Sequence, residues 1–146
     1  MTQFPEWKLV YQIGFDFLVQ PLAEIGVPEY KEYWDEAELA AYDGTQDDEQ
    51  GPILLAADGL VFNVYKGRNF YGPGGEYHLF AGRDATRFLA KTIVEEETAE
   101  QASQPLTMAE RASLAAWMFT IKSKYEVVGK LRGFDPTTTS MTTRNK

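Results

Sequence analysis

The sequence predicts one α+β domain with tails. Two apolar runs separated by Asp58-Gly59 predict a hairpin, and the spacing Thr107-x-x-Glu110 predicts the start of a long helix. Helix, hairpin, further helices and a strand follow one another in mixed order without an internal repeat, which argues for α+β. A length of 146 residues and an apolar fraction of 44% suit one ordinary domain with a real core.

The N-terminal segment Leu9–Ile25 predicts an amphipathic helix. Polar residues recur at every fourth position and leave apolar side chains for one face. The polar residues are Gln12, Asp16, Gln20 and Glu24, and the apolar ones are Leu9, Val10, Ile13, Phe17, Leu18 and Leu22. The segment is too polar to span a bilayer. Two hypotheses remain for it: packing on the domain core, or lying on a membrane or a partner.

Residues Trp34–Tyr42 predict a short helix near the start of the core domain, which we expect to begin near Tyr33. Residues typical of helix termini lie at both of its ends, Asp35 at the start and Asp43-Gly44 after the finish. The acidic residues that follow, Gln46–Gln50, predict a loop.

The hairpin is predicted from Ile53–Ala57 and Leu60–Tyr65, because Asp-Gly tolerates the positive φ angles of a type I′ turn. The Gly-Pro-Gly-Gly run at 72–75 predicts irregular chain. Ala85–Thr92 then predicts a helix with Asp84 as its N-cap.

The C-terminal third predicts one long helix and one strand. Glu95–Gln104 is acidic and predicts a solvated stretch, after which Thr107 opens a helix that runs to about Lys124. One face of that helix carries Leu114, Trp117, Met118 and Ile121. Glu126–Leu131 predicts a strand that closes the sheet, and the Thr-rich end from Pro136 predicts a disordered tail.

Composition excludes several classes of site. The net charge of −8, without a Lys/Arg cluster, argues against nucleic acid as a partner. The absence of cysteine removes disulfides, thiolate catalysis, Fe–S clusters and cysteine zinc sites. One histidine, His78, cannot supply two imidazoles. The carboxylates of Glu95–Glu97 form an acidic run and not an acid/base pair, so we expect a protein that is not an enzyme.

The stretch Asp58–Ala90, DGLVFNVYKGRNFYGPGGEYHLFAGRDATRFLA, is the most informative part of the chain. Its motifs are Phe70-Tyr71-Gly72-Pro73, Phe80-Ala81-Gly82 and Asp84-Ala85. Together with Trp117 and Lys124–Leu131 (KYEVVGKL), this stretch resembles the membrane-associated progesterone receptor family, the haem- and steroid-binding relatives of cytochrome b5. The resemblance covers roughly residues 34–132.

The resemblance implies a cytochrome b5-like haem/steroid-binding fold, in which a small mixed sheet and short helices form the ligand cleft. We expect this domain at residues 33–132, preceded by an amphipathic extension at 1–32 and followed by a disordered tail at 133–146. We expect no transmembrane segment in this chain, and a place in the cytoplasm or at the periphery of the endoplasmic reticulum membrane.

The resemblance also identifies an axial haem ligand. Cytochrome b5 holds haem between two histidines, the first directly before a Pro-Gly-Gly, and Gly72 takes that position here. The family resembled uses one tyrosine instead, and the matching residue is Tyr77. A phenol with a pKa near 10 must lose its proton to bind iron, which a ferric ion promotes better than a ferrous one. The implied cofactor is therefore ferric haem b, and electron shuttling is disfavoured.

Three further residues match family positions close to the haem. Tyr71 matches a tyrosine that donates a hydrogen bond near the axial ligand, while Lys124 and Tyr125 match a pair that can meet a propionate and the ligand shell. Each also has a plainer interpretation: Tyr71 as a rim residue, Lys124 as an ordinary lysine at a helix end, and Tyr125 as a core tyrosine.

His78 needs separate treatment, because imidazole is a common haem ligand. If residues 76–81 form a helical turn, neighbouring side chains point about 100° apart, so Tyr77 and His78 cannot both face the iron. We expect His78 to be a surface residue or one that supports the ligand shell, and its role as ligand stays an alternative.

Three functions remain open. The first, which we prefer, is a haem-binding protein that by resemblance supports microsomal haem monooxygenases, sterol metabolism or haem handling, and that forms a haem-dependent homodimer. The second is a module for a steroid or another apolar small molecule without obligatory haem. The third is a b5-type electron carrier, against which the single histidine argues.

Overall fold

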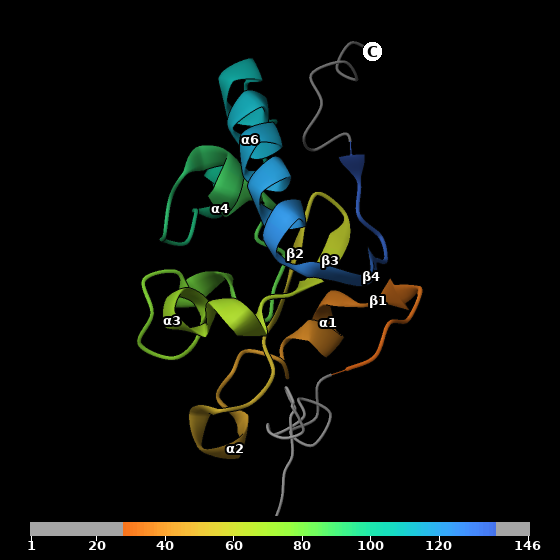
Figure 1. Cartoon of the computed structure of the whole chain (residues 1–146). Coiled ribbons are helices and arrows are strands. Elements are labelled where there is room, and N and C mark those ends of the chain that lie inside the picture. Colours follow the sequence, from red (N-terminus) through yellow and green to blue (C-terminus); the bar gives the residue numbers. More distant parts are fainter. Residues whose placement is uncertain (1–27, 137–146) are drawn as a thin grey trace, which may run out of the picture.

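A four-stranded mixed sheet with helices on both faces forms the part of the chain that the computed structural model describes, residues 28–136 (Figure 1). The strand order is β1-β4-β3-β2. The elements are β1 (Tyr33–Trp34), α1 (Glu36–Leu39), α2 (Gln46–Glu49), β2 (Leu54–Ala57), β3 (Leu60–Asn63), η2 (Tyr65–Gly67), α3 (Arg68–Tyr71), η3 (His78–Phe80), α4 (Thr86–Lys91), α5 (Ala99–Ala102), α6 (Met108–Lys124) and β4 (Glu126–Leu131). The helix expected at 9–25 and the tail beyond 136 lie outside the described residues.

The β2–β3 hairpin confirms the prediction from Asp-Gly. Asp58 and Gly59 have φ angles of 51° and 85°, the left-handed pair that a type I′ turn requires. The strands are slightly shorter than expected at their far ends. The Asn63 side-chain oxygen accepts a hydrogen bond from the Tyr65 backbone N–H at 3.0 Å, and this local turn ends β3 before Tyr65.

Strand β4 closes the sheet as predicted, pairing antiparallel with β3 and parallel with β1. The parallel pairing corrects one expectation, because Trp34 belongs to β1 and not to a helix. Its indole Nε1 donates to the Val128 carbonyl at 3.0 Å, and its own carbonyl accepts from the Arg132 N–H at 2.7 Å. Helix α1 begins after the expected cap Asp35 and ends at Leu39, earlier than predicted.

The acidic residues predicted as a loop form a single turn, α2. Asp47 and Asp48 have positive φ angles of 53° and 56°, so this turn is left-handed and is not a regular α-helix. The structure therefore has one irregular turn where a loop was predicted, and no regular helix there.

The core lies on both faces of the sheet, and β2 is buried from both sides. Leu54 and Ala56 belong to the cluster under α1, whereas Ile53, Leu55 and Ala57 belong to the larger cluster under α4 and α6. Helices α4 and α6 lie side by side on that second face (Figure 1). Strand alternation thus separates a small structural core from the one that borders the candidate site.

Helix α6 confirms the predicted capping box. The Thr107 hydroxyl accepts from the Glu110 N–H at 3.1 Å, and the Glu110 carboxylate accepts from the Thr107 N–H at 2.9 Å. The predicted apolar face is buried at Leu114, Met118 and Ile121, and Trp117 is partly buried.

Two expectations near α4 need correction. Ala85 is the N-cap of the helix, while the Asp84 carboxylate, one residue earlier, accepts from the Thr86 N–H at 3.1 Å and from its hydroxyl at 2.6 Å. The stretch from Glu95 is not uniformly solvated, since the Glu97 side chain is only 9% exposed and is paired with α4. Basic residues four apart along α4 create this partner surface.

Candidate functional site

A tight loop brings Tyr71 and Tyr77 together. The Tyr77 N–H donates to the Phe70 carbonyl at 2.8 Å, and the His78 ring Nδ1 lies 2.9 Å from the Tyr71 carbonyl oxygen. Between them the chain reverses through residues 72–75. Gly75 is required there, because a Cβ would collide with the Phe70 carbonyl. The two tyrosine rings end with centroids 6.2 Å apart.

Tyr77 lies on the wall of an apolar cavity of about 200 Å³ between η3, α4, the segment after α4, and α6. The lining residues are Glu76, Tyr77, Phe80, Phe88, Leu89, Thr92, Ile93, Val94 and Trp117. Tyr77 stacks on Phe80 at 5.3 Å between centroids, and Phe80 stacks on Phe88 at 5.4 Å with the ring planes only 4° apart. This row of flat rings suits a flat apolar ligand.

Tyr71 and Tyr125 lie behind Tyr77 and do not line the cavity. Tyr71 is 6% exposed, and its ring meets that of Tyr125 edge-on at 6.2 Å. Burial, reinforced by the neighbouring Tyr125 and Tyr77, raises the pKa of Tyr71 to about 12. Burial also raises the pKa of Tyr125. Both therefore remain neutral phenols, which are hydrogen-bond donors, at any physiological pH.

The hydroxyls of Tyr71, Tyr77 and Tyr125 receive no hydrogen-bond partner from residues 28–136. Tyr71 is the buried one of the three, and a buried hydroxyl without a protein partner is uncommon. Gly67 provides the room for the Tyr125 hydroxyl, because a Cβ there would overlap it. These observations fit a haem held by a phenol, with further phenols available to its ligand shell.

Lys124 and His78 occupy different surroundings from Tyr77. Lys124 is the exposed last residue of α6 and does not line the cavity. His78 also does not line it. Since a carbonyl only accepts, Nδ1 of His78 carries the hydrogen in its contact with Tyr71, and the ring supports the loop that holds both tyrosines.

Several wall residues were not identified as site residues from the sequence. Phe88 and Leu89 looked like ordinary residues of a short helix, and Trp117 looked like one member of an apolar helix face. Ile93 carried no signal, because its place depends on the left-handed turn at Thr92, which has a φ of 56°. The regular apolar spacing predicts burial but does not distinguish a cavity wall from filled core.

Comparisons with known proteins agree with the observed fold. The model of the family described as "Cytochrome b5-like Heme/Steroid binding domain" matches residues 35–132. "Probable steroid-binding protein 3" of Arabidopsis thaliana is 43% identical over 94 residues, which are 64% of this chain and 92% of that protein. Human "Membrane-associated progesterone receptor component 2" is 39% identical over 97 residues, which are 64% of this chain and 42% of that protein.

A solved structure shares the fold. An Arabidopsis thaliana protein with a cytochrome b5-like fold superposes with a TM-score of 0.59 at 38% sequence identity, over 73% of this chain and 95% of the other. The matched region spans less than half of the membrane steroid-binding proteins and receptor components, with shares of 35–48% in the four plant proteins and 42–43% in the three mammalian ones. Within residues 28–136, no helix is both long enough and apolar enough to cross a bilayer.

Proposed function

The chain belongs to the cytochrome b5-like haem/steroid-binding domain family, and on that premise we propose that it is a non-catalytic protein that binds ferric haem b with Tyr77 as the axial ligand. The observation that carries the proposal is the position of Tyr77 on the wall of the aromatic cavity, which His78 does not line. When bound, the haem supplies a Lewis-acidic ferric iron for the phenolate oxygen.

The other site residues have supporting roles in this proposal. Tyr71 donates a hydrogen bond toward the Tyr77 oxygen, for which its raised pKa and its hydroxyl without a partner in residues 28–136 suit it. Tyr125 lies against Tyr71 and holds it in place. Lys124, at the exposed end of α6, offers an ammonium to a propionate. His78 fixes the loop through the Tyr71 carbonyl.

A second candidate function is the binding of a steroid or another apolar small molecule without obligatory haem. The apolar lining of the cavity favours it, and so do the names of the steroid-binding relatives. A b5-type electron carrier is the weakest candidate, because the chain has one histidine and its ring contacts the Tyr71 carbonyl.

Cellular partners and organisation complete the proposal. We place the chain in the cytoplasm or peripherally at the endoplasmic reticulum membrane, where it serves microsomal haem monooxygenases, sterol metabolism or haem handling. Residues 33–132 form the binding domain, 1–32 an amphipathic extension and 133–146 a tail. Two open haem faces stack to form a homodimer, so the sedimenting mass should double when haem is added.

Titration of the full chain with haemin, followed by absorption, tests the proposed function. We expect saturable binding with a five-coordinate, high-spin ferric spectrum and a phenolate charge-transfer band. A spectrum that stays that of free haemin would contradict it. If progesterone then raised the melting temperature, the steroid module would become the better function.

A further inference from the structure

The segment that follows α4 forms one wall of the cavity. Helix α4 ends at Thr92 in a left-handed conformation, with φ 56° and ψ 50°, and the chain then turns across the cavity. Thr92, Ile93 and Val94 all line it, yet Val94 is 50% exposed to solvent. Val94 therefore borders both the cavity and the solvent.

Glu97 ties the end of this segment back to α4. Its carboxylate accepts two hydrogen bonds from the Arg87 guanidinium, at 2.7 and 3.1 Å, and lies 3.4 Å from the Lys91 ammonium. The Glu97 side chain is 9% exposed, and that of Arg87 is 19% exposed. A bidentate pair shielded from water in this way is stronger and more specific than an exposed ion pair.

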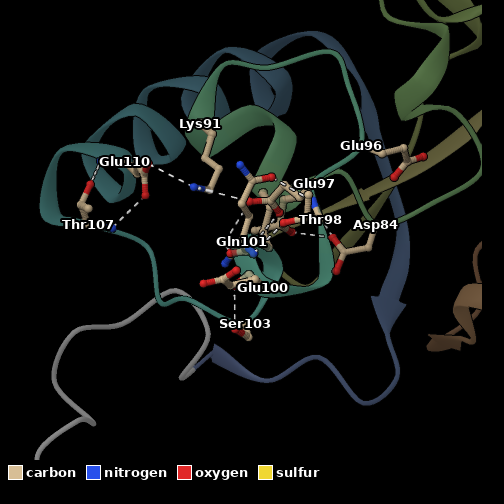
Figure 2. A network of polar contacts seen from close by, with 12 residues as sticks. Asp84, Lys91, Glu96, Glu97, Thr98, Glu100, Gln101, Ser103, Thr107 and Glu110 are labelled. Atoms are coloured by element: carbon tan, nitrogen blue, oxygen red, sulfur yellow. Dashed lines mark hydrogen bonds and ion pairs between the residues drawn. The ribbon is translucent and has the colours of Figure 1, made fainter.

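The ion pairs continue to α6, which contributes Trp117 to the lining of the cavity. The Lys91 ammonium lies 3.5 Å from the Glu110 carboxylate, and Glu110 also accepts from the Thr107 N–H at the start of α6. Figure 2 shows Lys91 reaching from α4 toward both Glu110 and Glu97. We call the chain Arg87–Glu97–Lys91–Glu110 the clasp. It joins all three segments that enclose this side of the cavity.

The cavity is small for a cofactor site. About 200 Å³ is less than the ~300–1,000 Å³ usual for small-molecule and cofactor sites, so a ligand of that class needs a wall to move. The walls formed by Phe88 and Leu89 are part of the buried core. Residues 92–98, by contrast, form a connection that is largely exposed.

We propose that the clasp holds residues 92–98 closed over the cavity and that a ligand enters when the clasp opens. This inference rests on the proposed function for the identity of the ligand. Opening separates Glu97 from Arg87 and Lys91, moves Ile93 and Val94 away from Tyr77, and leaves the stacked rings of the floor in place. The clasp therefore sets the rate of entry and does not supply a contact to the iron.

Glu97→Gln tests the clasp with two measurements, both on the full chain. The first is the hydrogen exchange of the Ile93 amide without ligand, since this amide is bonded to the Phe88 carbonyl at 3.0 Å and exchanges when the segment opens. We expect exchange to become about tenfold faster, which corresponds to about 1.4 kcal/mol. The second is the association rate of haemin in stopped-flow absorption, which we expect to rise about threefold or more.

Glu96→Gln is the matched control. It changes the same charge one residue away. The Glu96 carboxylate also accepts two hydrogen bonds, from Arg83 at 2.6 and 3.1 Å, but its side chain is 61% exposed, so water screens this pair. We expect both rates to stay at the wild-type values. If Glu97→Gln folds poorly, Glu110→Gln replaces it, because glutamine keeps the capping box while losing the Lys91 ion pair.

Three outcomes would overturn the clasp. The first is an Ile93 exchange rate that is the same in the wild type and in Glu97→Gln, and this result counts whether or not haemin binds. Faster exchange with an unchanged haemin association rate would remove its control of entry. If the Glu96 and Glu97 substitutions changed both rates equally, the cause would be the change of net charge and not the clasp. A wild type that binds no haemin at all contradicts the proposed function, and the exchange measurement then still decides whether the clasp closes the wall.

Discussion

The Tyr125 hydroxyl occupies the space that a Cβ on Gly67 would need. A Cβ on Gly67 would lie 3.1 Å from Cζ of Tyr125 and 3.2 Å from Cδ2 of Tyr71, in addition to overlapping the hydroxyl. Gly67 is buried, so the displaced rings have little room. The backbone of one short helix thus positions two of the three site tyrosines.

Gly67→Ala should therefore destabilise the fold by about 1–3 kcal/mol through overpacking. The free energy of unfolding in urea measures this change. Tyr125→Phe removes the hydroxyl that collides, so the double variant should recover part of the loss, with a coupling of about 0.5 kcal/mol or more. Additive losses would mean that Tyr125 moves aside freely and does not depend on Gly67.

Tyr77→Phe should lower haem affinity by at least about tenfold, or about 1.4 kcal/mol, because it deletes the proposed iron bond and keeps the stacked ring. Haemin titration measures the affinity. Tyr71→Phe should have an intermediate effect, since it removes a donor and no coordination. His78→Ala should leave the spectrum unaltered, at a cost of about 1 kcal/mol of stability from the lost Tyr71 contact. If His78→Ala abolishes the absorption of bound haem and Tyr77→Phe does not, the hypothesis of tyrosinate ligation is wrong.

The bound haem should resist reduction. Phenolate stabilises ferric iron, so dithionite should be needed to reduce the bound haem. The protein should bind ferrous haem more weakly than ferric haem. Absorption during a reductive titration measures both effects. Ready reduction by a b5-type reductase, with a six-coordinate low-spin spectrum, would instead support the electron carrier.

Alkaline pH should weaken the fold through Tyr71. Its pKa in the folded state is raised to about 12 by burial, against about 10 in the unfolded chain. Its contribution is therefore complete below about pH 10 and is lost as the pH rises toward 12, by at most about 2.7 kcal/mol. Unfolding in urea at about pH 8 and about pH 11 measures the loss. Tyr71→Phe should lose less stability over the same range, and an equal loss would assign the effect to other groups.

Acid should weaken the fold through Glu97 and Glu110. Hydrogen bonding to Arg87 lowers the pKa of Glu97, and hydrogen bonding to the Thr107 backbone lowers that of Glu110. Because both values are lower than in the unfolded chain, the stabilisation is present above the ordinary pKa of 4.5 and is lost as the pH falls through the folded-state values. Urea unfolding between about pH 6 and about pH 3 should show a shallower loss for Glu97→Gln than for the wild type. Parallel curves would contradict this.

Local features of the chain could be predicted because their causes lie within a few residues. The Asp58-Gly59 turn depends on two φ angles, and the cap of α6 depends on two side chains three residues apart. The family resemblance added the fold, which the comparisons confirm, and it identified Tyr77, whose role as ligand stays a prediction.

The sequence by itself thus determined the hairpin, the long helix, the closing strand and the family. Only the tertiary structure decided that Trp34 joins the sheet, that Glu97 pairs with Arg87 of α4, and that Tyr77 lines the cavity while His78 supports the loop behind it. The first two outcomes depend on contacts between segments distant in the chain. The third depends on the geometry of the short turn η3, which sets the directions of Tyr77 and His78. Residue spacing along the sequence specifies neither, because packing against the rest of the core selects among locally similar conformations.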